Sequence, residues 1–277
     1  MLAAIHARTA AWLAVSCRGS SAVSRALHTD AAIYSSRPRQ ARRLFWYSAL
    51  AIAATTALGS TIRLDAPSPE GSGQGTELDP ATSIAFPKTL RIPSKTPLPE
   101  FSLVGLGVRT VSFLGIKVYS VGFYADLANS SLNIPKTASP DEKIEYIIRN
   151  TACVLRIIPT RSTSYSHLRD GFIRALQTRL MLSKQRQSLS AEEELAIQSP
   201  LRKFKSMFPS TPLAKHAPLD VLLTAPSSQP RSLIVRDLGS VQSDWLATEF
   251  VLAYFEGDGL SPPLKKTVVE KLESFGS

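Results

Sequence analysis

The stretch from Phe101 to Asp126 constrains the fold more than any other part of the sequence. It reads FSLVGLGVRTVSFLGIKVYSVGFYAD, is rich in β-branched and aromatic residues, and has Leu114-Gly115 in its middle. This pattern is typical of two antiparallel strands joined by a tight turn. A two-residue turn at Leu114-Gly115 predicts three strand pairs: Phe113 with Ile116, Val111 with Val118, and Arg109 with Ser120.

This register places Arg109 on a face made of apolar and small residues. A guanidinium stays protonated, so in an apolar setting it needs an anionic partner, a ligand or water. The glycines at 105, 107 and 122 are expected to leave room beside it. The alternative is a structural arginine paired with a carboxylate or with carbonyls. The predicted face consists of Gly107, Arg109, Val111, Phe113, Val118, Ser120, Gly122 and Tyr124.

The net charge of +10 comes mostly from the N-terminus. Residues 1–43 contain seven arginines and one acidic residue, Asp30, so they carry +6 and leave about +4 for the rest. Residues 1–35 are also rich in Ala and Ser, which predicts a mitochondrial transit peptide. The alternative is a disordered basic tail. Because most of the positive charge lies in this leader, it is poor evidence for nucleic-acid binding, and no nucleic-acid partner is predicted.

Leu44–Ile62 is a stretch of nineteen residues without a charge, preceded by Arg42 and Arg43. As a helix it would span about 28 Å, close to the thickness of the hydrocarbon core of a bilayer. We therefore predict a single-pass transmembrane helix in the mitochondrial inner membrane, with the following domain in the intermembrane space because the positive flank favours the matrix. A buried or peripheral helix is the alternative. Residues 63–82, rich in Gly, Ser, Pro and acids, predict a flexible linker.

Residues 83–277 are predicted to form one α+β domain. The pattern indicates a mainly antiparallel sheet with helices packed on one face. Pro200 is expected to break or kink the helix in which it lies. Besides the first hairpin, the predicted strands are Ile84–Ile92, Ala152–Pro159, Asp220–Ala225 and Ser232–Leu238, and the predicted helices are Asp141–Asn150, Ser162–Gln185, Ser190–Met207, Asp244–Phe255 and Pro262–Phe275.

The segment GLGVRTVSFLGIKVYSVGFYAD resembles the first hairpin of the chalcone isomerase fold, with its Gly-x-Arg, Gly turn, Ile-Lys and Gly-x-Tyr. Leu260–Lys265 gives weaker support. Together with the N-terminus, the chain resembles the fungal altered inheritance of mitochondria proteins that carry a chalcone-isomerase-like domain. The resemblance covers residues 83 to the C-terminus. It implies an open-faced antiparallel β-sheet with a layer of α-helices.

The resemblance also implies a site. In plant chalcone isomerases the arginine that Arg109 matches is thought to hold the substrate phenolate and to stabilise negative charge, a role that suits a cation in a dry pocket. Tyr119 falls where the plant enzymes have a threonine, and Tyr165 matches a tyrosine at a helix start. The expected asparagine is Phe172, and a hydroxyl expected on the late helix falls at Ala253. The chain is therefore not expected to cyclise flavonoids; each tyrosine could instead be a core or rim residue.

His167 is a candidate metal ligand. It follows Tyr165 by two residues on the same predicted helix, about 200° round the axis, so the two cannot both face one cleft. Family members outside plants are linked to fatty acids or haem, so haem is the one candidate cofactor, with His167 as axial ligand and Arg109 at a propionate. The alternative is a surface histidine. Cys153 is expected to be a core thiol.

Three functional hypotheses follow. The first is a membrane-anchored domain that binds a small apolar carboxylate, a fatty acid or haem, through Arg109, Tyr119 and Tyr165, without flavonoid chemistry. The second is an intramolecular lyase or isomerase on an unknown substrate, with Arg109 as the catalytic residue. The third is a non-catalytic membrane assembly factor.

Overall fold

A seven-stranded antiparallel sheet organises the described residues, with the strand order β11-β10-β9-β6-β5-β4-β3. The computed structural model describes residues 75–94, 96–111, 114–227 and 229–274. The strands of this sheet are β3 (Thr89–Leu90), β4 (Phe101–Val111), β5 (Ile116–Ala125), β6 (Cys153–Pro159), β9 (Leu219–Leu223), β10 (Ser232–Val235) and β11 (Gly239–Gln242). Two short pairs accompany it: β1 (Thr76–Leu78) with β2 (Ala85–Pro87), and β7 (Thr163–Ser164) with β8 (Pro212–Leu213).

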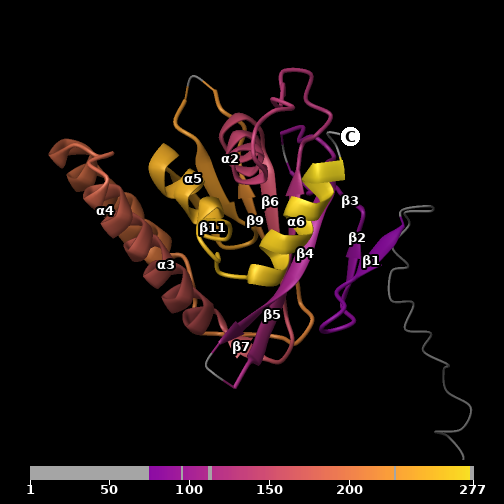
Figure 1. The fold of residues 1–277 in the computed structure, drawn as a ribbon. Helices are drawn as coiled ribbons and strands as arrows, with labels where there is room; N and C mark the ends of the chain where they lie inside the picture. Colours follow the sequence, from indigo (N-terminus) through magenta and orange to yellow (C-terminus); the bar gives the residue numbers. More distant parts are fainter. Residues whose placement is uncertain (1–74, 95, 112–113, 228, 275–277) are drawn as a thin grey trace, which may run out of the picture. The chain divides into compact units, whose positions relative to one another are not determined.

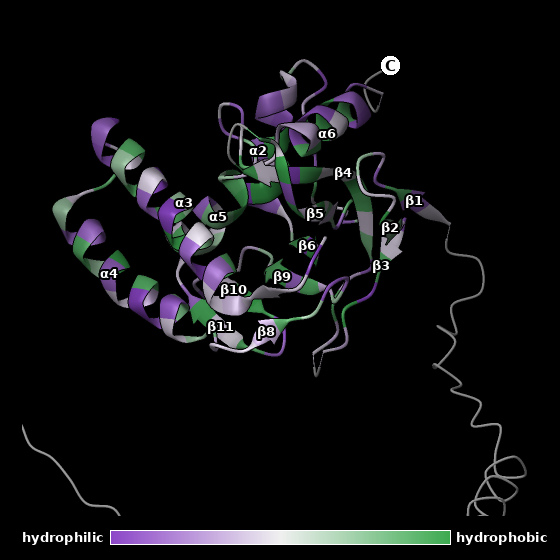
Figure 2. Ribbon diagram, turned by 90° about the horizontal axis from the view of Figure 1, so that it is seen from below, coloured by the Kyte–Doolittle hydropathy of each residue, from purple (hydrophilic) through white to green (hydrophobic). Residues whose placement is uncertain are grey.

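The five helices of the described residues lie against one face of this sheet (Figure 1) and share one apolar core with it. They are α2 (Pro140–Asn150), α3 (Tyr165–Gln185), α4 (Ala191–Ser206), α5 (Asp244–Leu252) and α6 (Pro262–Ser274). The opposite face packs against the chain around β2 and β3, through Phe86 and Leu90. In Figure 2, α3 and α4 lie side by side and alternate hydrophobic with hydrophilic residues. The predicted α+β architecture is confirmed.

The serines before the helices explain where two of them begin. Ser139 before α2 and Ser190 before α4 form capping boxes with Glu142 and Glu193, which satisfy backbone N–H groups at each N-terminus. Of the two predicted effects of Pro200, a break or a kink, the break does not occur, because α4 continues through it. Proline removes one N–H, but the carbonyl of the exposed Ala196 remains accessible to water, so the helix tolerates the loss.

Helix α6 lies against β4, and the two glycines of β4 make this close packing possible. A Cβ on Gly107 would lie 2.3 Å from the backbone nitrogen of Leu264, and one on Gly105 would lie 2.6 Å from Val268. The expectation that the glycines leave room beside Arg109 was therefore wrong. Helix α6 fills that space at 105 and 107, and the ring of Phe86 fills it at Gly122.

Hydrogen bonds from α6 also cover the part of β4 that extends beyond β3. The Thr267 hydroxyl donates to the Leu106 carbonyl at 2.7 Å and accepts from the Leu106 N–H at 3.0 Å. The Ser261 hydroxyl donates to the Val108 carbonyl at 2.9 Å. An uncovered strand edge invites pairing with another chain. The helix closes this edge instead.

The register of the first hairpin differs from the predicted one. Val111 pairs with Ile116, and after an irregularity Arg109 pairs with Tyr119 rather than Ser120. The strands are joined by residues 112–115, a longer connection than the predicted two-residue turn. Because a shift of one residue exchanges the two faces, Arg109 shares its face with Tyr119, while Ser120 belongs to the opposite face.

The folded part begins before residue 83. Thr76–Leu78 pairs with β2, and Asp79 is buried, with its carboxylate accepting a 2.5 Å hydrogen bond from Ser120. Residues 76–82 therefore belong to the domain and not to the predicted linker, because a buried carboxylate needs the donors that the fold supplies. The predicted transit peptide and the predicted span Leu44–Ile62 lie outside the described residues. Within the described ranges, no helix is both long enough and apolar enough to cross a membrane.

A buried ion cluster connects α3 to α5 and the turn after it. Arg179 donates to Glu249 at 2.6 Å and also pairs with Glu256, which pairs in turn with Arg186. Burial raises the pKa of Glu256, but its bonds to the two arginines outweigh burial and hold the pKa below its ordinary value. Cys153 is buried as predicted, and burial raises the pKa of its thiol to about 12.

Gly107→Ala tests the packing of α6 on β4. The added methyl group would overlap backbone atoms of Leu264, so we expect the free energy of unfolding to fall by about 1–3 kcal/mol. Gly171→Ala in α3 is the control, since its nearest neighbour is 4.0 Å away and alanine favours a helix by about 1 kcal/mol. Urea unfolding measures both. Equal stabilities would contradict the packing.

Glu256→Gln tests the ion cluster. A carboxylate whose pKa is lowered by folding stabilises the protein above its unfolded value of 4.5 and loses that contribution as the pH falls below it. The variant should therefore be less stable than the wild type at neutral pH, and the difference should shrink below pH 4.5. Urea unfolding over a pH series measures this. A difference independent of pH would contradict it.

Candidate functional site

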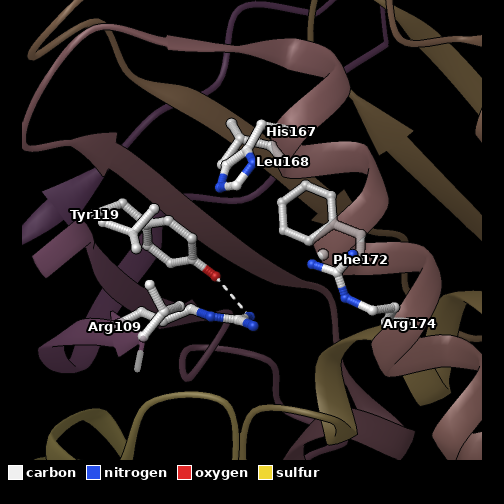
Figure 3. Close-up of a pocket in the computed structure, with 9 residues that line it drawn as sticks. Arg109, Tyr119, His167, Leu168, Phe172 and Arg174 are labelled. Carbon is white, nitrogen blue, oxygen red and sulfur yellow. Dashed lines mark hydrogen bonds between the residues drawn. The ribbon is translucent and has the colours of Figure 1, made fainter. Parts of the chain in front are cut away.

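Arg109 lies near the end of β4, half-buried, with its guanidinium directed toward α3 (Figure 3). Its Nη1 donates to the hydroxyl of Tyr119 at 3.2 Å, and its Cζ lies 5.8 Å from the centroid of that ring. Among the described residues, no carboxylate forms an ion pair with Arg109. The guanidinium therefore keeps most of its hydrogen-bonding capacity, because it has five N–H donors.

Two buried tyrosines extend the site from Arg109 into the core. The hydroxyls of Tyr119 and Tyr254 lie 2.8 Å apart, and Tyr254 is completely buried in the turn after α5. Two phenolic protons meet in this pair, but the contact between the two oxygens uses only one of them. In the described part of the chain, no hydrogen bond uses the other. The group therefore has more donors than acceptors.

The ionisation of these groups agrees with a donor site. Burial lowers the pKa of Arg109, but the neighbouring Tyr119 and Tyr254 outweigh it and raise the pKa above its ordinary value. Burial raises the pKa of Tyr254 well above its ordinary value. At neutral pH the site thus combines a permanent cation with a neutral phenol.

A small cavity lies beside Arg109, between the hairpin and α3 (Figure 3). Its volume is about 30 Å³, which is room for one or two water molecules. The apolar residues that line it belong to β4, β5 and α3. The lining consists of Arg109, Val111, Val118, Tyr119, His167, Leu168, Gly171, Phe172 and Arg174.

The structure brings together three of the four residues that the sequence singled out. Arg109, Tyr119 and His167 line the cavity, and His167 is exposed at its rim. Tyr165 does not line it, and its half-buried ring packs against the core instead. This separation agrees with the predicted angle between Tyr165 and His167 on one helix.

Two further residues were missed. The hydroxyl that was expected at Ala253 is supplied by Tyr254, one position later, and Arg174 also lines the cavity. Leu168, Gly171 and Arg174 follow one another at a spacing of three residues, which places them on one side of a helix. This spacing was the signal in the sequence that could have identified Arg174. The described residues contain no cluster of three His, Cys, Asp or Glu side chains that could hold a metal.

Comparison with known proteins places this architecture in a family. The profile of the "chalcone isomerase like" family matches residues 99–141 and 137–269. The altered inheritance of mitochondria protein 18, mitochondrial, of Lachancea thermotolerans is 25% identical over 255 residues, covering 78% of this chain and 80% of that protein. The protein of the same name from Debaryomyces hansenii is 25% identical over 233 residues, covering 69% and 75%.

A shorter match and a solved structure complete the comparison. An uncharacterized protein of Schizosaccharomyces pombe is 30% identical over 128 residues, which cover 40% of this chain and 46% of that protein. The crystal structure of a fatty-acid binding protein of Arabidopsis thaliana superposes with a TM-score of 0.54 at 18% identity, covering 73% of this chain and 99% of that one. This likeness shows the fold. Because the family profile spans more than half of the sequence, the chain belongs to the chalcone isomerase-like family, among the altered inheritance of mitochondria proteins.

Proposed function

We propose that this protein binds a small apolar carboxylate, such as a fatty acid, with the head group at Arg109, and that it does not cyclise flavonoids. The observation that carries the proposal is the guanidinium of Arg109, half-buried and without a carboxylate partner among the described residues. An anion in this place would accept charge-assisted hydrogen bonds from Arg109. The structural neighbour from Arabidopsis thaliana, named a fatty-acid binding protein, supports the same ligand class.

The surroundings of Arg109 suit a head group and the beginning of a tail. Arg109 and the hydroxyl of Tyr119 supply donors, while Val111, Val118 and Phe172 supply apolar contacts. The cavity of about 30 Å³ is far smaller than a long acyl chain. Binding the whole ligand therefore requires the hairpin and α3 to separate, and this opening is part of the proposal.

An isomerase is less well supported by these groups. Proton abstraction needs a base within hydrogen-bonding distance of the substrate. Arg109 and Arg174 are permanently protonated, so of the polar groups lining the cavity only His167 and the phenol of Tyr119 are candidates for a base. Donors alone are sufficient for binding. If no acid binds, the hypothesis of a non-catalytic assembly factor without a ligand is the one that remains.

We further propose that the protein acts in the mitochondrion, as a single-pass protein of the inner membrane. The Arg-rich, acid-poor residues 1–35 and the mitochondrial names of the yeast relatives support the compartment. The uncharged Leu44–Ile62 supports the anchor. In this arrangement the domain lies in the intermembrane space.

Haem is a second candidate ligand because His167 lines the same cavity as Arg109 and Arg174. The donor set fits: within the described residues the exposed imidazole has no hydrogen-bond partner, and a neutral imidazole binds haem iron. The volume does not fit, because about 30 Å³ cannot enclose a porphyrin. His167 would hold the iron and the two arginines the propionates only in an opened site.

Arg109→Gln tests the carboxylate site. The substitution removes a charge-assisted hydrogen bond worth about 1.5–3 kcal/mol, so the affinity for cis-parinaric acid should fall about tenfold to a hundredfold. The affinity for the corresponding alcohol should change little, because it carries no charge. Fluorescence titration with both probes measures this.

Two further variants control this experiment. Tyr119→Phe keeps the ring and removes one hydroxyl, so we expect a smaller loss of acid affinity. Arg202→Gln removes an exposed arginine of α4 and should bind like the wild type. Thermal unfolding checks that each variant is folded. Equal affinity of wild type and Arg109→Gln for the acid would refute the proposed function.

His167→Ala tests the haem hypothesis. If His167 is the axial ligand, haemin should give the wild type a shifted Soret band that the variant lacks. Absorption titration measures this shift. A spectrum identical to that of free haemin would remove haem from consideration.

A further inference from the structure

The β4–β5 hairpin ends in exposed apolar side chains. Val111, Leu114 and Ile116 expose 38%, 70% and 37% of their surface. Val111 also lines the cavity of Arg109, so this tip lies beside the mouth of the candidate site. Exposed aliphatic side chains are normally scattered singly over the surface of a soluble protein. Their grouping at the end of a hairpin therefore requires an explanation.

Cations surround this tip. The backbone N–H of Thr160 donates to the Val118 carbonyl at 3.1 Å, and its hydroxyl donates to the Lys117 carbonyl at 2.9 Å. These bonds place Arg161, the next residue, beside the base of the hairpin. Strand β7 follows Arg161 and pairs with β8, which leads directly to Lys215.

Helix α4 adds cations to the same end of the domain. Arg169 donates to Asp170 and lowers the pKa of that carboxyl, and Lys205 and Arg174 lower it further, so Lys205 lies near the first half of α3. We call the following exposed residues the basic end: Lys117, Arg161, Arg174, Arg202, Lys203, Lys205 and Lys215.

The sequence leaves this charge almost uncompensated. Residues 101–125, 146–191 and 195–219 contain one acidic residue, Asp170, and Arg169 already pairs with it. Among the described residues, none of the cations of the basic end forms an ion pair. The positive potential at this end is therefore free to act on a partner.

We propose that the basic end and the hairpin tip together dock onto the surface of an anionic phospholipid bilayer. Aliphatic side chains enter the head-group region while lysines and arginines contact lipid phosphates, the combination that binds peripheral proteins to membranes. The contact would bring the mouth of the Arg109 cavity to the lipid surface. It does not depend on what Arg109 binds.

The aliphatic tip favours a bilayer over nucleic acid. Single-stranded nucleic acids are bound by cations together with aromatic side chains on which bases stack. The described residues of the tip are Val111, Leu114 and Ile116, which gain nothing from a phosphate backbone but gain from leaving water. The positive charge and the apolar side chains together therefore favour an anionic bilayer as the partner.

Local hydrogen exchange on the full-length chain tests the proposal. Vesicles of phosphatidylcholine containing phosphatidylserine should slow exchange at residues 114–119 and 160–170, and vesicles of phosphatidylcholine alone should not. Salt should weaken the effect, because it screens exposed charges. The segment 44–62 is present in every variant, so protection of the domain rather than vesicle binding is the readout.

Neutralising the charges gives the quantitative prediction. Arg161→Gln and Lys205→Gln should each raise the lipid concentration for half-maximal protection about fivefold. Leu114→Ser should raise it about tenfold through lost apolar burial. Matched controls lie at the other end of the domain: Lys136→Gln in the loop before α2, and Leu195→Ser near the start of α4, where the leucine is 75% exposed.

Three outcomes would overturn the proposal. Equal protection by neutral vesicles would exclude recognition of anionic lipid. Unchanged protection in Arg161→Gln and Lys205→Gln would exclude the basic end. Protection by heparin as strong as that by anionic vesicles, together with a silent Leu114→Ser, would assign the surface to an acidic polymer instead.

Discussion

The close approach of α6 to β4 is the constraint on which the site depends. Only glycine at 105 and 107 lets the backbone of a helix lie directly on a strand, and the hydroxyls of Ser261 and Thr267 then bond to the exposed edge of that strand. Because β4 is held in this way, Arg109 near its end projects toward α3. The position of Arg109 thus depends on the backbone packing at Gly107, two residues earlier.

Much of the fold could be predicted from the sequence, because local patterns determine it. Alternating apolar residues, serine caps and helical spacing indicated the long elements and the α+β arrangement. The short strand β11 was missed, and the register of the first hairpin was wrong by one residue. Register depends on the conformation of the connection and on an irregularity at Arg109, and neither leaves a clear trace in residue types. An error of one residue was enough to place Ser120 instead of Tyr119 beside Arg109.

The site was predictable to the same degree. Arg109, Tyr119 and His167 were found because the hairpin motif and one helix carry them. Tyr254 was missed, because it approaches Tyr119 across 135 positions in the sequence and lies in a turn where helical spacing no longer applies. The glycines led to the opposite error, in which a feature was predicted that the structure does not have. Small residues beside an arginine suggested space for a ligand, whereas tertiary packing uses that space for a helix and an aromatic ring.

The attachment of Asp79 and Ala81 to the sheet has a mechanical consequence. Asp79 bonds to Ser120, and the ammonium of Lys117 donates to the Ala81 carbonyl at 2.6 Å, so this segment is fastened to β5, an interior strand that also carries Tyr119. Tension applied before Thr76 would act first on the β1–β2 pair and then, through Asp79 and Ala81, on the middle of the domain. Once the β1–β2 pair opened, a pull from this side would reach the strand that carries Tyr119.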